Sequence, residues 1–126
     1  YLLARTYATS DLTTETPLAY ALCYDCHSRD SLLAVPPPSR FPHKLHVVGQ
    51  NTPCSACHDP HGVNSLQGNS VNNSHLINFD LNIVAPDAQG RLAFEDQGAF
   101  SGQCFLSCHG AVHDAGKAYG SGGPGQ

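Results

Sequence analysis

A regular alternation of apolar and polar residues occupies the middle of the chain. Over residues 77–83, isoleucine, phenylalanine and leucine alternate with asparagine and aspartate, and this period of two residues predicts a half-buried β-strand. Residues 86–90 carry proline, aspartate and glycine and predict a turn, and residues 91–95 alternate weakly as a return strand. We therefore expect a β-hairpin within residues 62–103, with an irregular loop as the alternative.

The rest of the chain has little periodicity that would predict long elements. Residues 1–22 are rich in threonine, tyrosine, leucine and alanine. We expect an extended arm that ends in a short helical approach to Cys23 and packs on its own domain or on a neighbour. Residues 28–42 contain a triple proline that breaks regular structure, and residues 120–126 form a glycine-rich tail that we expect to be flexible. The expected fold is small and mostly irregular, and needs a cofactor to complete its core.

Cysteine and histidine recur together at three places. C-x-x-C-H occurs at Cys23, Cys26 and His27 and again at Cys54, Cys57 and His58, and C-x-x-x-C-H occurs at Cys104, Cys108 and His109. All six cysteines of the chain belong to these motifs. C-x-x-C-H is the attachment signature of a c-type haem, in which two thioethers hold the macrocycle and the histidine binds its iron. The sequence therefore predicts three covalently bound haem c groups.

Two other uses of paired cysteines agree less well with this pattern. A zinc ribbon also presents paired thiolates, but it would not need histidine directly after the second cysteine of every pair. A redox-active disulfide normally accompanies a thioredoxin-like pattern of strands and helices, which the chain lacks. The extra residue between Cys104 and Cys108 leaves attachment through a single thioether open at the third motif.

The composition restricts the sixth ligand of each iron. The chain has no methionine, so we expect low-spin, bis-histidine haems of low potential. Five histidines remain as candidate distal ligands: His43, His46, His61, His75 and His113. His61 lies three residues after His58, and three residues span at most roughly 10 Å, too little to pass round a macrocycle. His61, and likewise His113, can therefore bind only a neighbouring haem, in the same molecule or in an adjacent subunit; a second-shell, surface or propionate contact is the alternative for His61, His75 and His113.

Two groups of cytochromes share parts of this sequence. The segment from Phe41 to His46, with H-x-x-H eight residues before Cys54, resembles the start of small periplasmic triheme and tetraheme cytochromes of metal- and sulfate-reducing bacteria. In that family both histidines are distal ligands to different haems, which the resemblance implies for His43 and His46. Those proteins lack the insert of residues 62–103.

A larger part of the chain is similar to extracellular multihaem cytochromes with doubled C-x-x-C-H modules. The similar segments are residues 54–62, 72–80 and 102–110. The resemblance implies a haem-organised multihaem cytochrome c, with short helices at the haem motifs.

Charge and hydropathy limit the partners. Six basic and ten acidic residues give a net charge of −4, which argues against nucleic acid and anionic membrane surfaces. No apolar run approaches the roughly 20 residues of a membrane-spanning helix. The chain begins at Tyr1, which fits removal of a secretion signal, and we expect a periplasmic or extracellular protein. Its expected partners are redox proteins or extracellular electron acceptors, and the N-terminal arm could join copies into a homopolymer.

Together these features predict one triheme domain over residues 1–126. It consists of the arm 1–22, haems 1 and 2 in residues 23–61, the haem-free β-hairpin insert 62–103, and haem 3 with the tail in residues 104–126. The expected function is electron transfer without catalysis, in a wider version as the subunit of an extracellular cytochrome filament. The alternative is a multihaem oxyanion reductase with one open iron, which needs cationic groups clustered near a motif.

Overall fold

The computed structural model describes residues 4–63, 74–114 and 116–120. The chain divides into two compact units, Tyr1–Ser55 and Ala56–Gln126. The boundary falls inside the second C-x-x-C-H motif. The tail expected after Gly120 and the first two residues of the module at 72–80 lie outside the described residues.

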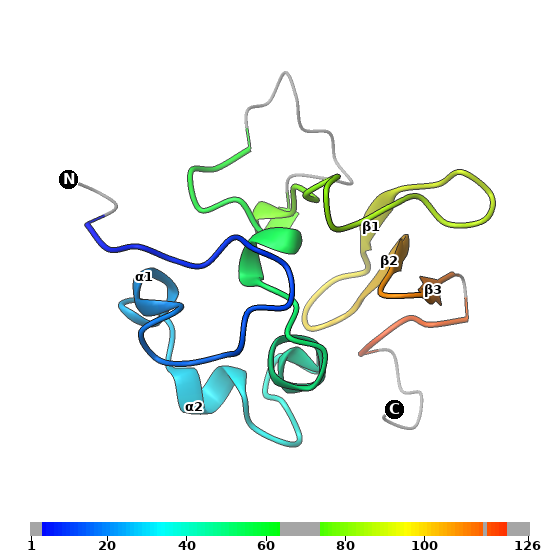
Figure 1. The fold of residues 1–126 in the computed structure, drawn as a ribbon. Coiled ribbons are helices and arrows are strands. Elements are labelled where there is room, and N and C mark those ends of the chain that lie inside the picture. The colour runs from blue at the N-terminus through cyan, green and yellow to red at the C-terminus, as the bar shows by residue number, and fades with distance from the viewer. Residues whose placement is uncertain (1–3, 64–73, 115, 121–126) are drawn as a thin grey trace. The chain divides into compact units, whose positions relative to one another are not determined.

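The first unit is built from short helical segments joined by irregular chain (Figure 1). They are α1 (Ala21–Tyr24), α2 (Arg29–Leu32), the π-helix η1 (Leu45–Gly49) and the 3-10 helix η2 (Cys54–Ala56), which crosses the unit boundary. Ser28 caps α2, because its side chain accepts a hydrogen bond from the Ser31 backbone N–H. The first motif begins on α1 and the second on η2.

The N-terminal arm lies on its own unit from residue 4 onward. The Ala8 N–H donates to the Ala19 carbonyl at 2.8 Å, so the chain doubles back before α1. Arg5 Nε pairs with Asp25 Oδ2 at 2.8 Å, although both side chains are exposed. Intramolecular contacts therefore hold the described part of the arm.

The second unit contains a three-stranded antiparallel sheet in the order β1-β2-β3 (Figure 1). The strands are β1 (Ala93–Asp96), β2 (Gly102–Cys108) and β3 (Ala111–His113). Cys108 pairs with Ala111, so His109 and Gly110 form a two-residue hairpin loop. Both have positive φ, 49° and 76°, as a type I′ turn requires. The third motif thus lies on a strand and a hairpin turn, where the sequence analysis expects another short helix.

Three buried residues, Ala56, Val84 and Leu106, form the core of this unit, and motif cysteines pack against them. Side chains on a strand alternate between its two faces, so Cys104, Leu106 and Cys108 share one face of β2. The packing of both cysteines against the core cluster agrees with this.

The strand predicted over residues 77–83 does not form, and the hairpin expected there is wrong in its first strand. The 3-10 helix η3 (Ser74–Leu76) precedes a single bridge between Ile77 and His58, and a turn follows. Asp80 explains the turn: its carboxylate accepts from the Asn82 N–H at 2.9 Å, and its carbonyl accepts from the N–H groups of residues 83 and 84. The return strand overlaps β1, which pairs with β2 instead. Each helix of the described residues has three to five residues, too few to cross a membrane.

Candidate functional site

The first motif is closed into a helical turn. The Cys23 carbonyl accepts hydrogen bonds from the Cys26 N–H at 3.3 Å and from the His27 N–H at 3.0 Å. Residues three and four apart on a helical turn lie on the same face, so both thiols and the imidazole project from one side. Cys26 and His27 are exposed and Cys23 is half-buried. This local geometry fits a macrocycle held by two thioethers beside its histidine ligand.

Two buried hydroxyls beside the motif cysteines lack hydrogen-bond partners. Within the described part of the chain, these are Tyr20 Oη, three residues before Cys23, and Ser55 Oγ, directly after Cys54. Burial raises the pKa of Tyr20 to about 12, and the charges of Cys54 and Cys23 add to this shift. Buried polar atoms in native structures nearly always have partners. A bound group with polar atoms next to these two motifs would supply the partners that the two hydroxyls lack.

The thiols of the first two motifs differ in ionisation. A hydrogen bond from Cys54 lowers the pKa of Cys23 to about 7. In the second unit, burial raises the pKa of Cys57 to about 12, with smaller contributions from Cys104 and Cys108. None of the six cysteines, all within the described residues, forms a disulfide.

Two of the predicted iron ligands have a defined tautomer. His58 Nδ1 lies 2.9 Å from the His75 carbonyl oxygen, and His46 Nδ1 lies 3.0 Å from the Pro42 carbonyl oxygen. A carbonyl oxygen only accepts, so Nδ1 donates in each bond, and in the neutral imidazole the lone pair is on Nε2. Metal-binding histidines usually donate their second nitrogen to such an acceptor.

Phe41 brings the two histidines of the H-x-x-H segment together. Its ring stacks on His46 with centroids 4.9 Å apart and meets His43 edge-on at 4.8 Å. The Ser39 hydroxyl lies 3.5 Å from His43 Nδ1. The aromatic contacts hold His43, which precedes η1, and His46, which lies in η1, around one ring.

The other candidate distal ligands contact acidic groups or the sheet. His61 Nδ1 lies 3.4 Å from Asp59 Oδ1, and His75 Nε2 lies 3.2 Å from Asp96 Oδ2. His113 ends β3. Across the described residues, no three histidine, cysteine or acidic side chains converge as ligands of one metal ion. The pairing of distal histidines with individual irons thus stays a prediction.

The third motif does not fit a doubly attached macrocycle in its extended conformation. Three strand residues lie between Cys104 and Cys108, so four residue steps separate the two cysteines by ~13 Å along β2. Residues three apart on a helical turn are only about 5–6 Å apart at Cβ. Burial raises the pKa of Cys104 to about 11. Cys108 directly precedes the exposed His109 at the hairpin turn, and these two residues fit attachment through one thioether.

Three further residues lie at the first motif and were not predicted from the sequence: Glu15, Tyr20 and Arg29. Tyr20 precedes Cys23 by three residues, about one helical turn, and this spacing is the sequence feature that could have indicated its place beside the motif. The contacts of Glu15 with Tyr24 and Arg29 are tertiary and left no local pattern. Comparison with protein-family models, curated proteins and solved structures gives no match to this chain.

Proposed function

We propose that the chain is an electron-transfer protein with three covalently attached, low-spin, bis-histidine haem c groups. The observation that carries the proposal is the turn of the first motif, which presents Cys23, Cys26 and His27 on one face. The repetition of the motif and its use of every cysteine extend the proposal to the whole chain. The proposed protein is a periplasmic or extracellular electron carrier with no substrate of its own.

The roles of the residues follow from their chemistry. The cysteines hold the macrocycles, by two thioethers at the first two motifs and through Cys108 at the third. His27, His58 and His109 bind iron on one side, and His46, His43 and His61 are our first choices for the other. Haem c, when bound, supplies reversible one-electron exchange through its edge. In His46 and His58, the Nδ1 contact with a carbonyl fixes the ring direction and leaves Nε2 as the nitrogen that would bind iron.

The test is the haem content and spin state of the purified protein. Intact mass spectrometry should show three haems per chain, and electron paramagnetic resonance should show low-spin ferric iron. The double variant Cys54→Ser/Cys57→Ser should lose one haem and keep two. A chain without covalent haem would refute the proposal, and a high-spin signal with spectral shifts on adding nitrite or sulfite would favour the oxyanion reductase.

A filament of such subunits is the wider form of the proposal. Electron microscopy of the native protein should then show continuous polymers. Isolated particles alone would remove the filament and leave the carrier. Because the described part of the arm packs on its own unit, assembly through this arm would require its release from those contacts.

A further inference from the structure

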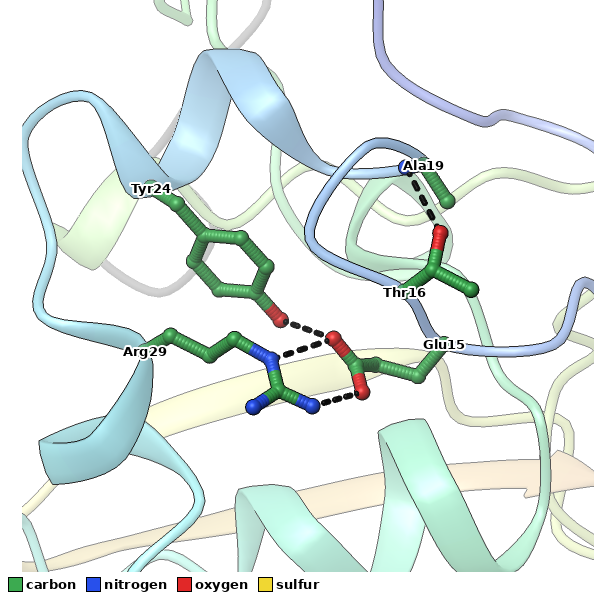
Figure 2. A network of polar contacts seen from close by, with 5 residues as sticks. All are labelled: Glu15, Thr16, Ala19, Tyr24 and Arg29. Atoms are coloured by element: carbon green, nitrogen blue, oxygen red, sulfur yellow. Dashed lines mark hydrogen bonds and ion pairs between the residues drawn. The ribbon is translucent and has the colours of Figure 1, made fainter.

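The carboxylate of Glu15, in the N-terminal arm, accepts hydrogen bonds from two residues at the first motif. Glu15 accepts from Arg29 Nε at 2.9 Å with one oxygen and from Arg29 Nη2 at 2.6 Å with the other. The Tyr24 hydroxyl donates to the first oxygen at 3.0 Å. Figure 2 shows the arginine fork and the phenol converging on the carboxylate.

This carboxylate is buried, and its contacts match its charge. The Glu15 side chain is only 4 % exposed, whereas Arg29 is 39 % exposed. A buried carboxylate is costly unless it is paired and hydrogen-bonded, and a bidentate arginine is the strongest such partner. The hydrogen bond from Arg29 is the main reason that the pKa of Glu15 lies below its ordinary value. The carboxylate, the guanidinium and the phenol hydroxyl therefore form one hydrogen-bonded network, in which the buried charge of Glu15 relies on both partners.

Local structure in the arm holds Glu15 at this place. The next residue, Thr16, accepts a hydrogen bond from the Ala19 N–H at 3.0 Å through its hydroxyl (Figure 2). That bond closes the turn between the arm and α1. The backbone at Glu15 thus has a defined direction before the carboxylate meets its partners.

The partners bracket the motif along the chain. Tyr24 lies between Cys23 and Cys26, and Arg29 lies two residues after His27. One contact of Glu15 is therefore inside the C-x-x-C-H turn and the other just behind it. We propose that Glu15 is a positioning residue for the first motif: its carboxylate, fixed to Tyr24 and Arg29, holds the turn that presents Cys23, Cys26 and His27 to one haem. This inference rests on the proposed function.

The test measures haem occupancy separately at each motif in the full chain. Glu15→Gln keeps the size of the side chain but cannot accept the arginine fork with both ends, and Arg29→Lys keeps the positive charge but loses the fork. Peptide mass spectrometry should show loss of most haem from the Cys23 and Cys26 peptide. Occupancy at the other two motifs should stay at the wild-type level. Asp11→Asn removes an exposed charge from the same arm and should leave all three motifs fully occupied.

A merely structural role would lower occupancy at every motif together. Equal occupancy in Glu15→Gln and wild type, or an equal loss at all three motifs, would overturn the inference. Should Glu15→Gln fail to accumulate, Tyr24→Phe removes one hydroxyl and must still cause a selective, smaller loss at the first motif. Wild-type protein without haem would instead refute the proposed function itself, and the positioning role with it.

Discussion

The thiol of Cys23 forms a hydrogen bond with Cys54, although the two cysteines belong to different C-x-x-C-H motifs. The neighbouring thiol stabilises the thiolate of Cys23, whose pKa falls to about 7. Cys57 and Cys104 pack against the core of the second unit, and burial raises the pKa values of these thiols to about 12 and about 11. The motif cysteines are therefore expected to differ greatly in reactivity in the haem-free chain, since the thiolate is the nucleophile.

Alkylation of the haem-free protein tests this difference. We expect iodoacetamide to modify Cys23 with a rate that rises through a midpoint near pH 7, because its pKa is about 7. Cys57 should react far more slowly at neutral pH, because burial raises its pKa to about 12. Peptide mass spectrometry after timed quenching gives the rate for each site. Equal rates for Cys23 and Cys57 at neutral pH would contradict the packing of these thiols.

The stability of the protein should fall in acid because of Glu15. The pKa of Glu15 is lowered in the folded state, mainly by its hydrogen bond with Arg29, so the unfolded state takes up protons first as the pH decreases. The contribution is complete above the ordinary glutamate pKa of about 4.3 and is lost as the pH falls through the folded value. Thermal unfolding between about pH 6 and pH 2 measures it.

Glu15→Gln should flatten this acid dependence without abolishing it. Asp59 also has a lowered pKa, first because the His61 backbone N–H donates to its carboxylate, and its effect has the same sign. The double variant Glu15→Gln/Asp59→Asn should be flatter still. An unchanged slope in Glu15→Gln would show that the carboxylate is not paired in solution.

Removing the unpaired hydroxyl of Tyr20 should stabilise the haem-free chain. The side chain is fully buried and its Oη has no partner, and an unsatisfied buried polar group costs about 1–3 kcal/mol. Tyr20→Phe should therefore raise the free energy of unfolding by about 1 kcal/mol, measured by urea denaturation. The same variant should lose this advantage in the haem-loaded protein if the bound group accepts from the hydroxyl. A destabilised haem-free variant would mean that Oη has a partner in solution.

A methyl group at Gly102 should destabilise the sheet. A Cβ there would lie 2.7 Å from Phe94 Cε2 and 2.7 Å from the Tyr119 hydroxyl, and Phe94 is buried. Gly102→Ala should therefore cost about 1–3 kcal/mol in the free energy of unfolding. Gly49→Ala is the control, because its Cβ would meet Leu45 Cδ1 at 3.5 Å and the Lys44 carbonyl oxygen at 4.0 Å, both ordinary contact distances. A similar effect of both substitutions on thermal unfolding would argue against the close contact in the sheet.

Single-cysteine variants distinguish the two modes of attachment at the third motif. With Cys104 and Cys108 apart on an extended strand, we expect Cys104→Ser to retain the third haem through Cys108, and Cys108→Ser to lose it. Intact mass gives the haem count, and the pyridine haemochrome spectrum reports the number of thioethers. Loss of the haem in Cys104→Ser would show that the strand bends to deliver both thiols.

The candidate sites could be predicted from the sequence because the haem-attachment motif is a pattern of neighbours in the chain. Cys23, Cys26 and His27 are one helical turn apart, and no distant residue is needed to place them on one face. The third motif has one extra residue between its cysteines, which changes its spacing, and in the structure both cysteines of this motif lie on a strand. The alternation over residues 77–83 predicts a strand that does not form, because the side chain and carbonyl of Asp80 accept hydrogen bonds from the backbone and close a turn.

Only the tertiary structure shows the contacts between residues that are distant in the chain. Glu15 meets Arg29 across 14 residues, Cys23 meets Cys54 across 31, and β1 pairs with β2 rather than with residues 77–83. No local periodicity encodes these contacts, because burial and charge pairing select them when the chain folds. The sequence by itself determined the three cysteine-histidine motifs and the haem attachment that they predict, since their spacing is local. Folding determined which thiols adjoin and which arginine and tyrosine the Glu15 carboxylate contacts, since burial requires a partner for each charge.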